Sequence, residues 1–445
     1  MPSLGPRIVV AGTHSGVGKT TVATGLLAAL RAAGHRVRSA KVGPDFIDPG
    51  YHALATGERP RNLDPWLCGQ EALGPLAARA AAGGDVLVIE GVMGLFDGAA
   101  DGSDSSTADV ARALGAPVLL VVDASAMAGS VAAVVHGFAT LDPRVDVAGV
   151  VLNRVASDGH ALMLREALAG LRVPVVGELR RDDRLLWRDR HLGLVPVAES
   201  PEIVATTLEA LGAAITAGCD LDVVMRIARA APMRTVGPVA LPSLGPPVRI
   251  AVATGRAFTF LYADTVDALV AAGAEVVPFD PLVDRCLPDA IAGLLVGGGF
   301  PEVHAVELAD NVELLGDVAA RVRDGIVTWA ECGGLLWLAR SLDGVPMAGV
   351  LPVSATMGER LTLGYRDVRT LAESPLGPSG TTFRGHEFHY SSLDEPGDAL
   401  ELVTRFGSAR AGFASSILLA SYVHHHPGGD PSLVAAFVNA CREGQ

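Results

Sequence analysis

A glycine-rich segment and one cysteine are the residues in this 445-residue chain whose types and spacing could do chemistry. The segment Gly12 to Thr21 reads GTHSGVGKTT, follows the apolar run Ile8 to Ala11 and opens into an Ala/Leu-rich stretch. A strand, a glycine-rich turn and a helix together allow backbone N–H groups to bind the phosphates of a nucleotide. Lys19 would supply a cation to the terminal phosphates, and the Thr20 hydroxyl can ligate Mg²⁺. The residues expected to contact ATP are Gly12, Thr13, Gly16, Val17, Gly18, Lys19, Thr20 and Thr21.

The details of this loop narrow the class of nucleotide-binding protein. Gly12 lies one residue further from Gly18 than the standard GxxxxGK[ST] spacing allows. His14 occupies the position at which partition ATPases have a lysine, which argues against a dimerising positioning ATPase. The GTxxxxGKT form resembles dethiobiotin synthetase and its relatives, which phosphorylate a carboxyl or carbamate group. Asn153 lies where folds of that kind recognise the base, unless it only terminates the preceding strand.

Four carboxylates follow the second and third strands expected in the N-terminal half: Asp45, Asp48, Glu90 and Asp97. Ligands of a parallel sheet sit beyond the carboxyl ends of its strands, so we expect these side chains to converge beside the phosphate loop. Carboxylates next to a triphosphate require a divalent cation between them, which implies Mg²⁺. The alternative is that some of them cap helices or turns, and it is strongest for Asp48, which precedes Pro49-Gly50. It fits Glu90 least, because Glu90 ends a buried strand.

The elements that must position these residues predict an α/β protein of two domains. Near-continuous Val/Ile/Leu runs alternate with helical stretches, which is typical of strands buried on both faces of a parallel sheet. Residues 231–247 contain five prolines and one charge, which predicts a linker between domains at 1–230 and 248–445. The expected strands are Arg7–Ala11, Arg36–Val42, Asp85–Ile89, Pro117–Asp123, Val147–Leu152 and Pro174–Gly177, then Arg249–Val252, Glu275–Pro278, Gly293–Val296 and Ile326–Trp329.

Cys332 lies in the second domain, between the last of these strands and a helix, in the sequence TWAECGG. Strand, sharp turn and helix form a nucleophile elbow, in which small neighbours permit a strained backbone and the helix N-terminus favours the thiolate. The glycines at 297–299 can offer backbone N–H groups to an oxyanion. His424 is the expected base for the thiol, with His386 and His389 as rivals.

Composition restricts the partners and the compartment. A net charge of −14 disfavours a nucleic-acid binder, because no basic stripe is available to neutralise phosphates. The apolar runs have the length of strands, and no signal peptide is visible, so no membrane partner is expected. The five cysteines show no CxxC pairing, which favours reduced thiols in a cytoplasmic protein. The oligomeric state cannot be read from the sequence, and a homodimer stays open.

Seven strings spread over nearly the whole chain carry a family resemblance: GTHSGVGKT, KVGPDFIDPGYH, EGVMGLFDG, GGGFPE, AECGG, RGHEFHYS and ASYVH. Together they closely resemble the cobyrinic acid (or hydrogenobyrinic acid) a,c-diamide synthases of cobalamin biosynthesis. The resemblance implies a dethiobiotin synthetase-like ATPase domain fused to a class I glutamine amidotransferase-like domain. KVGPDFIDP and RGHEFHYS are highly specific strings, whereas the phosphate loop alone would not have sufficed.

The family resemblance also implies an enzyme with two sites. Cys332, activated by His424, would release ammonia from L-glutamine, and ATP would phosphorylate a corrin acetate for ammonia to convert into an amide. Carried over by position, Thr20, Asp45 and Glu90 would surround Mg²⁺. Asp48, Tyr51 and Asp97 would lie nearer the corrinoid substrate.

This chain departs from ordinary amidotransferases at the residue that orients the catalytic histidine. Ordinary amidotransferases place a glutamate two residues after the catalytic histidine, whereas this chain has His426 there. The synthase family that it resembles also lacks that glutamate. The sequence therefore predicts a Cys-His pair and does not say what orients His424.

Alternative functions remain at this point. A related amidase could act on a sirohydrochlorin-type macrocycle, and cobyric acid synthase shares the architecture, although KVGPDFIDP fits it poorly. From another class, a nucleotide-dependent regulator could carry an inactive amidotransferase-like domain. The intact AECGG and ASYVH strings argue against the regulator.

Overall fold

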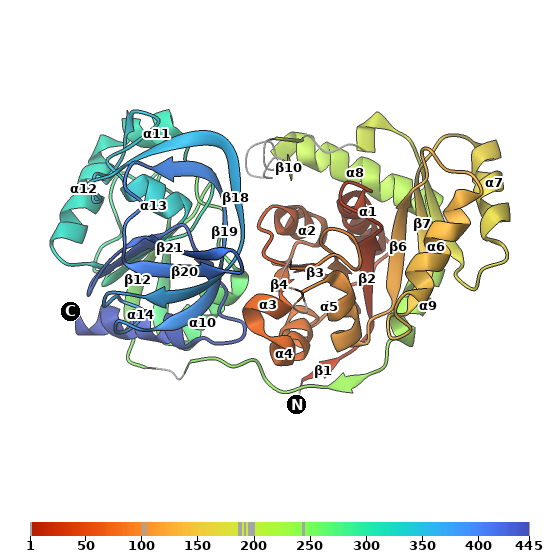
Figure 1. Cartoon of the computed structure of the whole chain (residues 1–445), viewed down its shortest axis with the longest axis horizontal. Helices are drawn as coiled ribbons and strands as arrows, with labels where there is room; N and C mark the ends of the chain where they lie inside the picture. Colours follow the sequence, from red (N-terminus) through yellow and green to blue (C-terminus); the bar gives the residue numbers. More distant parts are fainter. Residues whose placement is uncertain are drawn as a thin grey trace. The chain divides into compact units, whose positions relative to one another are not determined.

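The structure is a computed structural model that describes residues 2–99, 102, 105–185, 189–190, 193–194, 201–242 and 245–444. The chain divides into two compact units, Met1–Val239 and Ala240–Gln445, which the colours of Figure 1 distinguish. Within the described residues, no helix combines the length and the apolar character needed to cross a bilayer.

A parallel sheet forms the centre of the first unit. Its apolar runs are buried on both faces, as expected for strands covered by helices. Among the described residues, seven strands lie in the order β4 (Arg61–Leu63), β3 (Val37–Val42), β5 (Val86–Glu90), β2 (Arg7–Gly12), β6 (Val118–Asp123), β7 (Val147–Val155) and β8 (Val175–Arg180). Six of them match the predicted strands to within a few residues, and the short β4 was not predicted.

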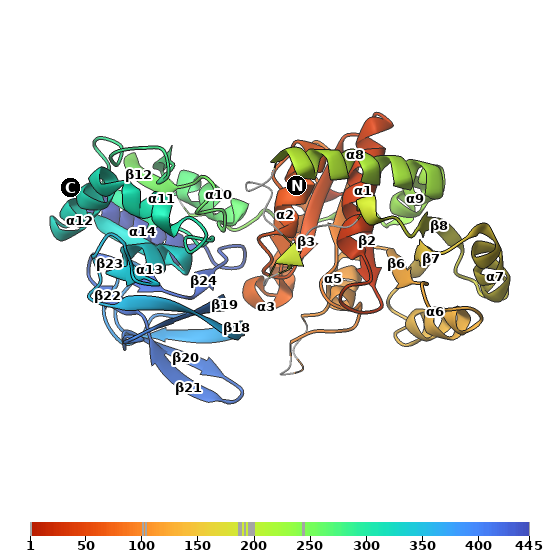
Figure 2. The ribbon, with the colours of Figure 1, turned by 90° about the horizontal axis from the view of Figure 1, so that it is seen from above.

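Helices cover this sheet, and the first of them begins at the end of the phosphate loop. The first, α1 (Lys19–Ala32), packs with α8 (Pro201–Gly218) and α9 (Leu221–Ala230) on one face, as Figure 2 shows. α8 lies close enough to α1 that a methyl group at Gly25 would lie 2.6 Å from Ile215 Cγ1. The other helices of this unit are α2 (Asp48–Thr56), α3 (Pro65–Cys68), α4 (Gln70–Ala80), α5 (Thr107–Leu114), α6 (Ser130–Thr140) and α7 (Asp158–Leu168).

The predicted linker is partly structured. Within it, β11 (Arg234–Thr235) pairs antiparallel with β1 (Ser3–Leu4). The Arg234 guanidinium also donates a 2.6 Å hydrogen bond to the Ala113 carbonyl. The start of the proline-rich segment therefore belongs to the first unit, and the boundary between the units falls after Val239.

A second, mostly parallel sheet carries the amidotransferase-type residues. Among the described residues its strands lie in the order β13 (Ala274–Phe279), β12 (Val248–Ala253), β14 (Gly293–Val296), β15 (Val327–Glu331), β23 (Leu418–Ser421) and β22 (Phe413–Ser415). Only the β22–β23 pair is antiparallel. The helices of this unit are α10 (Ala263–Ala271), α11 (Ala305–Asp310), α12 (Val312–Arg323), α13 (Gly333–Leu338) and α14 (Ser432–Glu443).

A second sheet in this unit was not predicted. The long strands β18 (Ser354–Thr370) and β19 (Thr382–Leu393) form an antiparallel pair with a register shift between Met357 and Thr362. β20 (Leu400–Thr404) and β21 (Gly407–Ala411) extend it from β18, and β24 (His424–His425) pairs with β19. The short strands β16 (Ser341–Leu342) and β17 (Val345–Pro346) complete it. This sheet brings residues 384–391 beside residues 424–425, which lie far away in the sequence.

Candidate active sites

The phosphate loop connects the end of β2 to the start of α1. Gly16 and Gly18 have φ angles of 81° and 97°, in the left-handed region that favours glycine. A methyl group at Gly12 would lie 2.9 Å from Lys19 Cγ, so the glycine also makes room for the lysine. Lys19 Nζ donates a 3.2 Å hydrogen bond to the His14 carbonyl. Burial, reinforced by the charge of nearby Lys41, lowers the pKa of Lys19 to about 8.

A buried cluster of charges lies at the carboxyl ends of β3 and β5, beside this loop. The Thr20 hydroxyl donates to Glu90 Oε1 at 2.7 Å and lies 3.4 Å from Asp48 Oδ2. Lys41 Nζ lies 2.6 Å from Asp48 Oδ2 and 2.9 Å from Glu90 Oε1. The second oxygen of Glu90 lies 2.6 Å from Nε2 of the fully buried His52. One ammonium thus joins two carboxylates that both reach the hydroxyl of the phosphate loop.

The pKa shifts in this cluster follow from burial and pairing. Burial alone would lower the Lys41 pKa, but Asp48 and Glu90 outweigh it and raise that pKa above its usual range. Burial would raise the pKa of Glu90, and Lys41 with His52 outweighs it and holds that pKa below its usual range. Burial, reinforced by Asp45, raises the pKa of Asp48 despite the opposing effect of Lys41. One cation therefore keeps Glu90 ionised and leaves Asp48 incompletely compensated.

Asp45 caps the start of α2, its Oδ2 lies 3.9 Å from Lys41 Nζ, and its predicted contact with Mg²⁺ stays a prediction. Its Oδ1 accepts hydrogen bonds from the backbone N–H groups of Ile47 (2.7 Å) and Asp48 (3.1 Å), at the start of α2. The turn-capping role that the sequence allowed for Asp48 thus belongs to Asp45. Asp48 is the carboxylate that reaches Thr20, because α2 begins at this residue and directs it toward the phosphate loop.

Three other residues of the first unit were predicted to contact a ligand, and each lies in a different environment: Tyr51, Asp97 and Asn153. Tyr51 is 2% exposed on α2, so its ring offers little surface to a substrate. The carboxylate of Asp97 accepts a 2.9 Å hydrogen bond from the Gly94 N–H in a tight turn, and this residue is exposed. The Asn153 amide donates a 2.8 Å bond to the Val17 carbonyl, and its oxygen accepts from the Arg154 N–H. Asn153 therefore supports the phosphate loop, and base recognition by this residue stays a prediction.

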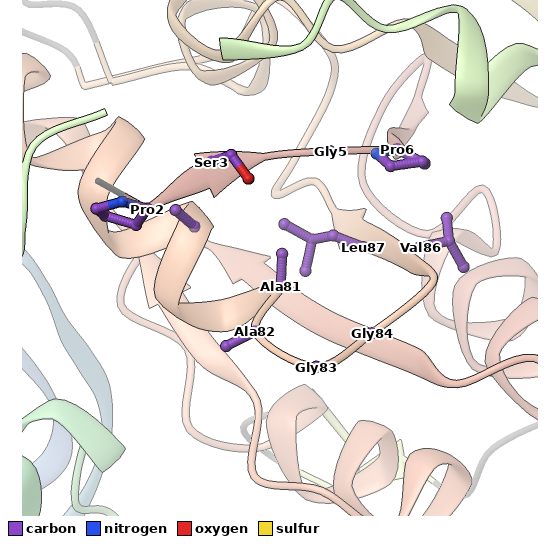
Figure 3. Close-up of a pocket in the computed structure, with 11 residues that line it drawn as sticks. Pro2, Ser3, Gly5, Pro6, Ala81, Ala82, Gly83, Gly84, Val86 and Leu87 are labelled. Carbon is purple, nitrogen blue, oxygen red and sulfur yellow. The ribbon is translucent and has the colours of Figure 1, made fainter. Parts of the chain in front are cut away.

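A pocket in this unit, shown in Figure 3, lies apart from these residues. It opens between the N-terminal segment at 2–6, the end of α4 and the loop that enters β5. Its lining consists of small or apolar residues such as Pro6, Ala81, Gly84 and Leu87. It adjoins the start of β5, whereas the charged cluster lies where that strand ends, so it is not the phosphate site.

Cys332 forms a sharp turn between β15 and α13. Its φ and ψ angles of 48° and −100° are unusual for a residue with a side chain, as a nucleophile elbow requires. The turn is held by a 2.7 Å hydrogen bond from the Cys332 N–H to the Ser421 carbonyl of β23. A methyl group at Gly333 would lie 2.9 Å from the Gly299 nitrogen, so the glycine after the cysteine lets the 297–299 turn approach.

The imidazole of His424 lies beside this cysteine. A methyl group at Gly298 would lie 3.1 Å from His424 Nε2 and 3.3 Å from Cys332 Cβ, so both side chains flank one glycine. His424 is fully buried in β24, which pairs with β19 so that His424 is opposite His386. The thiol itself lies 3.9 Å from the Phe388 carbonyl, to which it donates.

The structure contradicts one electrostatic expectation for Cys332. Burial raises the pKa of its thiol well above the usual value, and Glu302 and Glu331 raise it further. A hydrogen bond from the Gly333 N–H opposes them, but it comes from the start of a helix of only six residues. Burial outweighs this short helix and favours the neutral form of the thiol, which would need a base to act as a nucleophile.

The rival histidines are occupied in other ways. Burial, reinforced by His424, lowers the pKa of His386 to about 3. His389 stacks on Tyr422 with ring centroids 3.6 Å apart, and its Nδ1 lies 2.8 Å from the Ser391 carbonyl. These contacts make His424 the best placed of the three candidates for the thiol.

The three consecutive histidines face different surroundings. His424 adjoins Cys332, whereas His425 lies between the rings of Trp329 and Phe383, with centroids 6.0 Å and 5.8 Å away. His426 Nδ1 accepts a 3.0 Å hydrogen bond from the Gly428 N–H, and its Nε2 lies 4.0 Å from Asp264. The run thus combines one site residue with two residues that hold the surrounding structure.

Comparison with known proteins identifies the family. Residues 8–194 match the CobQ/CobB/MinD/ParA nucleotide binding domain, and residues 249–431 match the CobB/CobQ-like glutamine amidotransferase domain. The chain is 48% identical to the hydrogenobyrinate a,c-diamide synthase of Streptomyces coelicolor, over 98% of both chains. It is 46% identical to the enzyme of that name from Thermobifida fusca, over 98% of this chain and 96% of the relative. A cobyrinate a,c-diamide synthase from a Synechococcus strain is 43% identical over 98% of both chains.

The chain belongs to the a,c-diamide synthase family. No functional role was predicted for three residues of these sites: Lys41, His52 and Glu331. In the sequence, Lys41 is a single charged residue within a predicted strand. Its relation to the charged cluster follows from its position opposite Glu90 in the β3–β5 register. His52 and Glu331 carry no spacing signal, because their contacts join elements that the sequence separates by many residues.

Proposed function

We propose that this protein catalyses the ATP- and glutamine-dependent amidation of the a and c acetate carboxylates of hydrogenobyrinate or cobyrinate. The observation that carries the proposal is the 48% identity to a hydrogenobyrinate a,c-diamide synthase across 98% of both chains. The two clusters described above supply the groups that each half of this reaction needs. The substrates are then small molecules: the corrinoid acid, L-glutamine and ATP.

In the second unit, Cys332 and His424 would release ammonia. The thiol transfers its proton to His424 Nε2 while sulfur attacks the side-chain amide carbon of glutamine. Backbone N–H groups around Gly299 and Gly333 would stabilise the oxyanion; the close approach of these two glycines supports this role. The proton then passes to the departing nitrogen, ammonia leaves, and water hydrolyses the glutamyl thioester to glutamate and free thiol.

In the first unit, the phosphate loop would bind ATP, with Lys19 at the terminal phosphates. An acetate oxygen of the corrinoid attacks the γ-phosphorus, which releases ADP and gives an acyl phosphate. Ammonia attacks the acyl carbon, phosphate leaves, and a proton is lost to give the amide. A second cycle converts the second acetate. ATP is required because a carboxylate is a poor acyl donor.

The oxygen donors beside the loop fit Mg²⁺. The Thr20 hydroxyl, Glu90 and Asp48 are gathered around one region, and Mg²⁺ binds through one or two carboxylates plus phosphate oxygens rather than through a cage of protein ligands. Among the described residues, no group of three or more His, Cys, Asp or Glu side chains is arranged to hold a metal ion by itself. When bound, the cation would neutralise the charge that develops on the transferred phosphate.

The compartment and assembly form part of the proposal. All five cysteines are free thiols, which agrees with a reducing cytoplasm. The strong negative charge gives no support to a nucleic-acid partner. A homodimer stays an untested expectation.

The deciding experiment supplies purified protein with ATP, Mg²⁺ and either hydrogenobyrinic or cobyrinic acid, and follows product masses by mass spectrometry. With glutamine or with ammonium, we expect two conversions of carboxyl to amide in at least one of these acids. Cys332→Ala should lose the glutamine-dependent reaction and keep the ammonium-dependent one. If neither acid is amidated with ammonium present, the proposal is wrong.

A further inference from the structure

The Cys332–His424 pair lacks the acid that ordinary amidotransferases place two residues after the histidine. His426 occupies that position, and its ring lies against Tyr262, with centroids 4.4 Å apart, and near Asp264. A base that must accept a thiol proton through Nε2 needs its Nδ1 to carry the other proton and to be held in place. The orientation of His424 therefore depends on the group that faces its Nδ1.

Glu331 is the residue that faces this nitrogen. It ends β15 directly before the nucleophile and is 4% exposed. Its Oε2 lies 3.6 Å from His424 Nδ1, and its Oε1 accepts a 3.1 Å hydrogen bond from the His425 N–H. The same carboxylate thus contacts the imidazole and the backbone of β24, and its chain neighbour is the nucleophile.

The other titratable groups around His424 do not duplicate this contact. From β19, His386 lies opposite His424 in the strand register, and burial keeps it neutral by lowering its pKa to about 3. From the elbow, Cys332 flanks Gly298 together with His424, since a methyl group at Gly298 would lie 3.3 Å from Cys332 Cβ and 3.1 Å from His424 Nε2. Two further carboxylates act on the thiol: Glu302, and Glu387, which is paired with Arg366 at 2.6 Å.

We infer that Glu331 is the positioning residue for His424, replacing the acid that other amidotransferases place after the histidine. Its carboxylate favours the tautomer with the proton on Nδ1, so that Nε2 can accept the proton of the thiol. The imidazolium then formed faces a negative charge until it donates its proton to the departing ammonia. This inference rests on the glutaminase role proposed above. It couples the position of the base to the strand that carries the nucleophile.

Glu331→Gln provides the test, because glutamine has the same length and keeps an oxygen to accept the His425 N–H. It removes the charge, and its amide can donate to Nδ1, which favours the wrong tautomer of His424. We expect the kcat of glutamine hydrolysis to fall about 100-fold or more. The limb of the pH profile that reports the imidazole should move to lower pH by about one unit, because an opposite charge within about 4 Å is lost. Ammonium-dependent amidation should match the wild type.

Three controls keep the result interpretable. Glu313→Gln makes the same chemical change at an exposed position on α12 and should leave both activities unchanged. Thermal unfolding and the ammonium-dependent rate report whether each variant is folded. Glu331→Asp keeps the charge, so its pH limb should stay nearer to the wild-type position than that of Glu331→Gln, even if its rate falls.

Two results would overturn the inference. One is Glu331→Gln with a wild-type rate and pH profile. The other is equal loss in the Gln and Asp variants with an unmoved pH limb, which would leave Glu331 only the support of the His425 backbone. If the wild type itself fails to amidate a corrinoid with ammonium, the proposed function falls, whereas the glutaminase comparison still decides the role of Glu331.

Discussion

The two candidate sites control charge in opposite ways. At the phosphate loop, buried charges lie against each other: Lys41 lies between Asp48 and Glu90 and keeps Glu90 ionised, and His52 holds the far oxygen of Glu90. At the elbow, the reactive group is kept neutral, because burial raises the pKa of the Cys332 thiol. The first site suits a ligand that arrives with charge of its own, and the second suits a neutral amide that becomes charged only during the reaction.

The comparison predicts that removing one charge from the cluster at the phosphate loop strongly impairs amidation. In Glu90→Gln, Lys41 loses one of its two counterions and Thr20 loses its 2.7 Å acceptor. We expect ammonium-dependent amidation to fall by about 100-fold or more, as when a group that orients a metal or a phosphate is removed. Glutamine hydrolysis by the same preparation should be unchanged, and it reports that the second unit is folded.

An amidation rate within a few-fold of the wild type in Glu90→Gln would contradict the role of this cluster. Lys41→Met is the companion variant, because it removes the shared cation and leaves Glu90 and Asp48 facing each other. Both variants should affect the same half-reaction, which steady-state assays with glutamine alone and with ammonium alone can separate.

At the elbow, shape should matter as well as the charge of Glu331. Gly298→Ala would place a methyl group against His424 Cε1, and 3.3 Å from Cys332 Cβ. The imidazole must shift, and a displacement of about 1 Å can reduce a rate by up to about 100-fold. We expect glutaminase activity to fall between about 10- and 100-fold, with ammonium-dependent amidation preserved.

Gly316→Ala on α12 is the matched control, since a methyl group there meets nothing within 4 Å. It should leave both activities unchanged and stabilise the helix by roughly 0.5–1 kcal/mol. Equal glutaminase activity in the two alanine variants would show that Gly298 does not set the position of His424.

Parts of these sites could be predicted because local sequence determines them. The phosphate loop and Cys332 each lie between a strand and a helix, and glycine is required where backbones approach. Glu90 was found because it ends a buried strand. Most parallel strands of both units were predicted from apolar runs, which burial on two faces requires, whereas the short β4 and β23 were not.

The rest depended on contacts between distant elements. Asp45 and Asp48 lie three residues apart in one turn, and only the start of α2 decides which one caps the backbone and which one reaches Thr20. The β18–β19 sheet was missed because its strands are partly exposed and show no continuous apolar run. The thiol pKa was misjudged because the sequence shows the helix start and does not show the burial that outweighs it.

A smaller effect, on the acid stability of the protein, is expected from His425, which is buried near the elbow. Burial, reinforced by His426, lowers the pKa of His425 to about 3, below its value of about 6.5 in an unfolded chain. Below about pH 6.5 the unfolded chain binds a proton that the folded protein does not, so stability falls by up to about 1.4 kcal/mol per pH unit until about pH 3. His425→Phe removes this linkage and keeps an aromatic ring between Trp329 and Phe383. Its acid-unfolding midpoint, followed by tryptophan fluorescence, should move to lower pH. An unchanged or higher midpoint would contradict the assignment.

The smallest effect should come from Asp45, whose Oδ1 caps the turn before α2 and whose Oδ2 lies 3.9 Å from Lys41 Nζ. Asp45→Asn keeps an oxygen for the Ile47 and Asp48 N–H groups, so we expect less than about 1 kcal/mol of destabilisation, as for other conservative cap changes. Amidation should stay within about threefold of the wild type, whereas Asp48→Asn should lose far more, because it removes the carboxylate that reaches both Lys41 and Thr20. The two rates, measured across a range of Mg²⁺ concentrations, decide which carboxylate belongs to the cation. If Asp45→Asn raised the Mg²⁺ requirement as much as Asp48→Asn, Asp45 would return to the metal site, and the hydrogen bonds at the start of α2 would describe only the resting protein.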